Sequence, residues 1–129
     1  MNRSEFIWQY QVFSKQALAL ADKARREGLL SLEDELETDK VNARDIFQYG
    51  ISLVIDGTDS EIINKILSNI IAQDTDEYSH LIKVIKKEAA LLIQSGINSR
   101  IIGMVLNSYT DLPLSDDKTE DEDEDDVFI

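Results

Sequence analysis

The sequence predicts an all-α fold: one compact helical domain of about five or six helices over residues 1–114, followed by a disordered acidic tail over residues 115–129. Apolar residues recur at spacings of three and four in several segments. Three of the five glycines, Gly28, Gly57 and Gly96, stand where such segments end, as glycine often does after a helix. A chain of 129 residues suffices for one hydrophobic core but not for two.

The first predicted helix covers residues 4–27, with Asn2 and Glu5 as a capping pair at its start. Its apolar stripe consists of Phe6, Tyr10, Phe13, Ala17, Leu20 and Ala24. A short second helix is predicted over residues 30–37. It would bury Leu29, Leu32 and Leu36 and leave its acidic residues in water.

A third helix is predicted to start at a cap formed by Asn42 with Asp45 and to run to Ile55. Its inner face would consist of Ile46, Phe47, Leu53 and Val54. Residues 51–55 also fit a strand, because they are rich in β-branched side chains and precede the turn dipeptide Asp56-Gly57. The helix is favoured because no second β-rich segment of matching length follows to pair with such a strand.

Three more helical segments follow. Residues 58–61 signal a helix start, and the helix after them would place six apolar residues on one face: Ile62, Ile63, Ile66, Leu67, Ile70 and Ile71. After an interruption at residues 74–76, helical spacing resumes up to Gly96 with Tyr78, Leu81, Ile82, Ile85, Ala89, Leu92 and Ile93. Asn98 would cap a last helix carrying Ile101, Ile102, Val105 and Leu106, and Pro113 limits its length.

The negative charge is concentrated in the tail. Of the net charge of −13, residues 116–126 contribute −8 through nine acids and one lysine, which leaves about −5 for the other residues. Such a segment buries too little apolar surface to offset the entropy of ordering, so we predict disorder. The last residues, Val127 to Ile129, are apolar and are either a short docking peptide or without a role.

The composition argues against an enzyme, a cofactor site and a metal site. There is no cysteine, and the one histidine, His80, lacks the companions of a metal site or a nucleophile relay. Asp56 to Asp59 is superficially similar to a calcium loop but lacks its spaced ligands. The acids Glu33, Asp34, Glu35 and Glu37 are interpreted as a solvated face, and the sequence contains no glycine-rich phosphate loop.

Nucleic-acid binding and membrane insertion are also not expected. Lys83, Lys86 and Lys87 form the only basic cluster besides Arg25 and Arg26. The longest apolar runs, at residues 18–21 and 51–55, are far shorter than the roughly 20 residues that span a bilayer. We therefore expect a cytoplasmic protein.

Three segments resemble the cytoplasmic part of the flagellar stator protein family MotA. They are KARREGLLSLEDELE at residues 23–37, ISLVIDGTD at residues 51–59 and KEAALLIQSGINSR at residues 87–100. The family's corresponding patterns are Ala-Arg-x-x-Gly-Leu-Leu-x-Leu-Glu, Leu-Val-x-Asp-Gly-Thr-Asp and Ile-Gln-x-Gly-x-Asn-Pro-Arg. In the third, Ser99 replaces the proline. The resemblance extends over about residues 17–112, without the family's membrane helices.

The resemblance implies a stator-like binding module of the flagellar motor that contacts rotor or stator proteins and modulates motility, without conducting ions by itself. It implies that Arg25 and Glu33, with the neighbouring Arg26, contact the rotor switch protein FliG or another motor protein, and it allows a homo-oligomer. A second interpretation is that Arg25 and Glu33 are solvated or pair with each other. The alternative function is a helical cytoplasmic adaptor, unrelated to motility, that recruits a basic partner through its acidic tail.

Overall fold

The computed structural model describes residues 1–36 and 45–113, and all regular secondary structure in these residues is helical, as predicted. The elements in chain order are α1 (Arg3–Glu27), the 3₁₀ helix η1 (Leu29–Glu35), α2 (Ile46–Ile55), α3 (Ser60–Ile71), α4 (Glu77–Gln94) and α5 (Ser99–Asn107). Residues 51–55 are part of α2, so the strand alternative is wrong. The predicted tail, residues 115–129, and the C-terminal Val127 to Ile129 lie outside the described residues.

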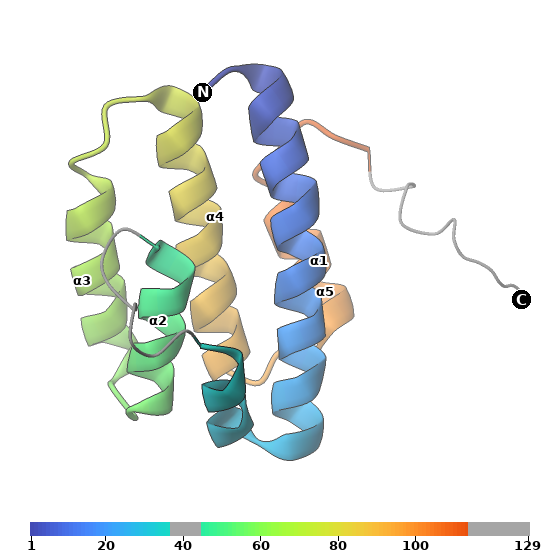
Figure 1. Cartoon of the computed structure of the whole chain (residues 1–129), viewed down its shortest axis with the longest axis vertical. Helices are drawn as coiled ribbons and strands as arrows, with labels where there is room; N and C mark the ends of the chain where they lie inside the picture. The colour runs from blue at the N-terminus through green and yellow to red at the C-terminus, as the bar shows by residue number, and fades with distance from the viewer. Residues whose placement is uncertain (37–44, 114–129) are drawn as a thin grey trace, which may run out of the picture.

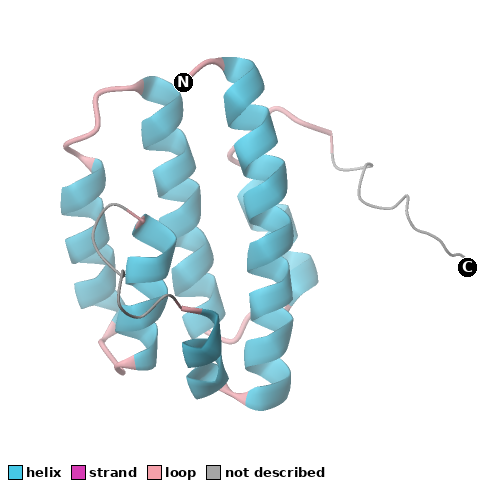
Figure 2. Ribbon diagram, in the orientation of Figure 1, coloured by secondary structure: helices cyan, strands magenta, loops and turns pink. Residues whose placement is uncertain are grey.

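Helix α4 lies at the centre of the bundle and packs against α1, α2, α3 and α5 (Figure 1). The helices are connected at two ends of the molecule (Figure 2). We call one the aspartate end, which holds the start of α1, the turn at residues 72–76 and the end of α5. We call the other the glycine end, which holds the turns at Gly28, Gly57 and Gly96.

Side-chain caps explain where the α-helices start. Asn2 and Glu5 form the predicted capping box, and Asn98 caps α5 as predicted. Asp45 alone caps α2 by accepting a hydrogen bond from the Gln48 amide at 3.1 Å, whereas Asn42 lies outside the described residues. Asp59 and Asp76 cap α3 and α4 in the same way. Each cap satisfies an amide that the helix itself leaves without a partner.

The core follows the predicted stripes with local corrections. All six predicted stripe residues of α1 are buried. In α2, Gly50 and Ile51 are buried while Leu53 is half-buried, because the face toward α4 is centred on Ile51. The inner face of α3 is the column Ile63, Leu67 and Ile71, whereas Ile62 is 49% exposed. A column at i, i+4 and i+8 faces one neighbouring helix, so the adjacent position points elsewhere.

The second helix also differs from its prediction. It is a 3₁₀ helix that ends at Glu35, with Leu32 fully buried and Leu29 and Leu36 half-buried. 3₁₀ turns often connect helices, and this one, with seven residues, is longer than most. Within residues 1–36 and 45–113, no helix combines the length and apolar character needed to cross a bilayer.

Candidate functional site

The glycine end is built from three turns whose glycines have positive φ angles. These are 93° at Gly28, 80° at Gly57 and 78° at Gly96. L-residues adopt such angles at a cost that glycine avoids, so each glycine lets the chain reverse immediately after a helix. The turns gather the end of α1, η1, the start of α3 and the start of α5 at one end of the bundle (Figure 1).

Hydrogen bonds join the three segments that resemble the MotA family at this end. Arg25, in the first segment, donates from Nη1 to the carbonyl oxygen of Gly96, in the third. Gln94, also in the third, donates from Nε2 to the carbonyl oxygen of Thr58, in the second, at 2.8 Å. Gly96 lies in the turn just beyond the C-terminal end of α4, and the negative end of a helix dipole favours a cation such as Arg25 nearby.

The two predicted arginines differ in their surroundings. Arg25 is exposed, yet its guanidinium ties α1 to the turn between α4 and α5. The side chain of Arg26 is 66% exposed, and its ion pair with the adjacent Glu27 is long, at 3.8 Å. Arg26 is therefore the more available cation for another molecule.

The third predicted residue, Glu33, is exposed on η1 and forms no ion pair within the described part of the chain. Its neighbours do: Lys23 Nζ lies 2.8 Å from Glu35 and 4.0 Å from Asp34. The hydrogen bond to Glu35 raises the pKa of Lys23 and holds η1 against α1.

The predicted charges do not pair with each other. No ion pair joins Arg25 to Glu33 among residues 1–36 and 45–113. Lys23 and Arg25 are two residues apart on a helix, so they point roughly 200° apart. Lys23 reaches η1 and Arg25 reaches the turn at Gly96. A common binding face for Arg25 and Glu33 thus stays a prediction.

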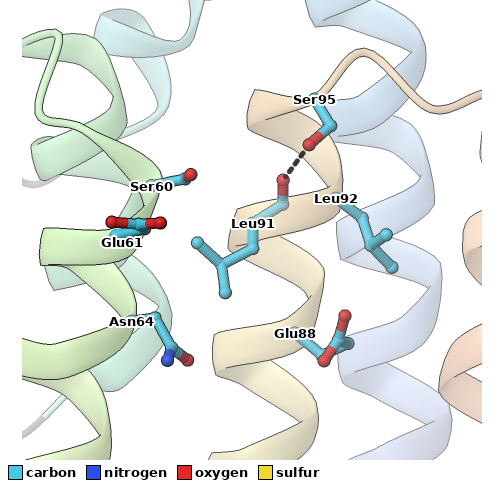
Figure 3. A pocket seen from close by; sticks show the side chains of 7 residues that line it. All are labelled: Ser60, Glu61, Asn64, Glu88, Leu91, Leu92 and Ser95. Atoms are coloured by element: carbon cyan, nitrogen blue, oxygen red, sulfur yellow. Dashed lines mark hydrogen bonds between the residues drawn. The ribbon is translucent and has the colours of Figure 1, made fainter.

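A groove between α3 and α4 at the glycine end was not predicted from the sequence. It has a volume of about 300 Å³ and is lined by Ser60, Glu61 and Asn64 of α3 and by Glu88, Leu91, Leu92 and Ser95 of α4 (Figure 3). The short polar side chains at positions 60 and 64 of α3, one turn apart, were the signal available in the sequence. They lie on the face toward α4, where a larger apolar residue would fill the space.

The described residues show no metal-binding arrangement. No three His, Asp or Glu side chains converge within residues 1–36 and 45–113. His80 is exposed on α4. The structure thus defines an all-α domain. Its candidate site is a charged surface at one end of the helix bundle.

Comparison with known proteins gives a more particular relationship. Motility protein A of Borreliella burgdorferi is 37% identical over 91 residues, which cover 70% of this chain and 34% of that protein. Motility protein A of Treponema pallidum is 30% identical over 87 residues (67% and 32%). The uncharacterized protein YtxD of Bacillus subtilis is 31% identical over 93 residues (71% and 33%).

Over these residues the chain is thus similar to proteins named Motility protein A from spirochaetes of the genera Borreliella and Treponema. The chain spans about a third of the length of the curated relatives it matches. No family model matches the chain, and no solved structure matches it significantly.

Proposed function

We propose that this chain acts as a stator-like binding module of the bacterial flagellar motor, which contacts rotor or stator proteins and modulates motility. The observation that carries the proposal is the meeting of the three MotA-like segments at the glycine end, joined by the bonds of Arg25 to Gly96 and of Gln94 to Thr58. The relatives named Motility protein A support the connection to motility.

The proposed contact consists of Arg25, Arg26 and Glu33, with the rotor switch protein FliG as the partner. Arg26 and Glu33 are exposed and carry opposite charges, so they suit a partner surface that bears both signs. Arg25 has a second role, because its bond to Gly96 positions the end of α1. Exposed charges act mainly on the rate of encounter and are screened over about 10 Å at 0.1 M salt. The contact should therefore be weak and salt-sensitive.

The test is a titration of the full chain with the C-terminal domain of the rotor switch protein from Borreliella burgdorferi, first at low and then at high salt. We expect Arg26→Glu and Glu33→Lys each to weaken binding several-fold. The matched controls are Lys65→Glu on α3 and Glu77→Lys on α4, which change charge by the same amount on exposed residues elsewhere. Both should bind like the native chain.

Arg25→Glu should weaken binding too, but it also removes the bond to Gly96, so its melting temperature must be measured alongside. Charge reversal on the partner that restores binding of Arg26→Glu would identify the direct contact. Equal affinity of all variants, or no binding by the native chain, would overturn the proposed rotor contact.

A further inference from the structure

The groove between α3 and α4 has an apolar floor and a polar rim. Leu91 and Leu92 supply the apolar part, and the side chain of Leu91 lies between the two helices (Figure 3). Hydroxyl and amide groups of Ser60, Asn64 and Ser95 border it. The Ser95 hydroxyl donates to the Leu91 carbonyl at 3.1 Å, and its oxygen can still accept hydrogen bonds.

The rim of the groove carries two carboxylates. Glu61 and Glu88 stand on opposite helices of the groove, and neither forms an ion pair within the described residues. Glu88 accepts a hydrogen bond from the Tyr109 hydroxyl at 3.1 Å. The nearest cation in sequence, Lys87, is directed to Ser68 Oγ at 3.0 Å, one turn along α3 from Asn64. Glu88 lies level with Asn64, toward the end of the groove where Lys87 reaches Ser68, whereas Glu61 lies further toward Ser95, so the two carboxylates are spread along the groove (Figure 3).

We propose that this groove binds an arginine side chain of a protein partner. An arginine has an apolar stem that would pack on Leu91 and Leu92, and its planar group offers five donors. Carboxylates at Glu61 and Glu88, with the oxygen atoms of Ser60, Asn64 and Ser95, are acceptors for such donors. A lysine would present one compact ammonium, which suits a spread set of acceptors less well. The groove of about 300 Å³ is at the small end of ligand sites, which suits one side chain.

Charge also excludes the chain's own acidic segment as the occupant. Residues 116–126 carry a net charge of −8, from nine acids and one lysine, and would be repelled by Glu61 and Glu88. The proposal does not depend on the motor contact, because it uses none of Arg25, Arg26 and Glu33. A partner outside the flagellar motor would satisfy it equally.

The test is an NMR titration of the isotope-labelled full chain with N-acetyl-L-argininamide, which presents the arginine side chain without peptide charges. The matched probe is N-acetyl-L-citrullinamide, which has nearly the same shape but no charge. We expect saturable amide shifts with the arginine probe at Ser60, Asn64, Glu88, Leu91 and Ser95, with a Kd in the millimolar range, and at least tenfold weaker binding of the citrulline probe.

Two variants test the carboxylates. Glu61→Gln should weaken binding of the arginine probe several-fold. Because Glu61 is exposed on the first turn of α3, the variant should fold. The double variant Glu61→Gln with Glu88→Gln should have at least tenfold lower affinity for the arginine probe, whereas the control Glu77→Gln should bind the probe like the native chain. Shifts confined to residues 116–126, equal binding of the citrulline probe, or undiminished binding by Glu61→Gln would overturn the proposal. The variants Arg26→Glu and Glu33→Lys should leave this titration unchanged, so its failure is distinct from that of the rotor contact.

Discussion

The ion pairs at the two ends of the bundle differ in how far apart their residues are in the sequence. At the aspartate end, ion pairs join segments that are far apart in the sequence: Arg3 lies 3.0 Å from Asp111, 108 residues away. Asp74 lies 2.8 Å from Lys83 and also accepts from the Ser79 hydroxyl and the Asp76 amide. The Met1 N-terminal ammonium also pairs with Asp76, 75 residues away. At the glycine end the ion pairs span 12 residues at most, between Lys23 and Glu35 and between Arg26 and Glu27.

This difference separates charges that complete the fold from charges that are available to another molecule. Asp74 has three partners within the chain, so its carboxylate holds the turn before α4. Glu33 and Glu61 have no ion pair among the described residues, and both lie at the glycine end. Substitutions at the aspartate end should therefore change stability, and substitutions of these unpaired acids should change binding.

The largest expected effect is on stability and concerns the buried side chain that holds η1 at the glycine end. Leu32 is fully buried, so Leu32→Ala should lower the free energy of unfolding by about 2–5 kcal/mol, through lost burial and the cavity left behind. Leu30 is the matched control, because it lies in the same 3₁₀ helix and is 70% exposed. Chemical denaturation of both variants measures the difference. A loss as large for Leu30→Ala would show that the apolar anchor of η1 is misassigned.

The next largest effect concerns the backbone of the glycine end. Gly28 has φ 93° and ψ 158°, a conformation that is essentially restricted to glycine. Gly28→Ala should therefore cost about 1–3 kcal/mol of stability, although the space for a methyl group is open. Gly103 is the control, because it is in α5 and an added Cβ would meet Leu18 at 3.5 Å, an ordinary contact. Gly103→Ala should be neutral or stabilising by up to about 1 kcal/mol. Equal melting temperatures for the two variants would contradict this explanation.

Most of the fold could be predicted from the sequence because its signals are local. The stripe from Phe6 to Ala24, the caps at Asn2 and Asn98 and the three glycine stops each depend on a few neighbouring residues. The errors in the predicted core arose where packing against a neighbouring helix determines which side chains are buried. Ile51 rather than Leu53 faces inward because α2 packs closely on α4, where a Cβ at Gly50 would meet Ala90 at 3.0 Å.

The candidate site could be predicted only in part, because it depends on pairings across the fold. The sequence and its family resemblance indicated Arg25, Arg26 and Glu33, and the structure places all three exposed at the glycine end. Nothing local indicated that Arg25 bonds to Gly96, 71 residues away. The groove was missed for the same reason, since Glu61 and Glu88 belong to different helices and line one groove only when α3 packs against α4.

A smaller, pH-dependent effect tests the aspartate end. The Lys83 ammonium, the Ser79 hydroxyl and the Asp76 amide hold the pKa of Asp74 well below its ordinary value of 3.8. A carboxyl with a depressed pKa stabilises the folded state above the unfolded-state pKa and loses this contribution as the pH falls through the folded-state value. Asp74→Asn should therefore be less stable than the native chain at pH 7, and the gap should narrow below about pH 4. Asp22→Asn, at an exposed site on α1, is the control. A gap that does not depend on pH would contradict the role of charge.

The smallest expected effect compares two neighbouring acids of η1. Glu35 receives a hydrogen bond from Lys23 at 2.8 Å, whereas Glu33 has no ion pair within the described residues. Glu35→Gln should lower the melting temperature slightly, and the loss should shrink at high salt because the pair is exposed. Glu33→Gln should leave the melting temperature unchanged at every salt concentration, while it weakens rotor binding. Thermal denaturation of both variants at low and high salt decides between these roles. If Glu33→Gln destabilised the chain as much as Glu35→Gln does, Glu33 would hold the fold and would no longer be an available charge at the glycine end.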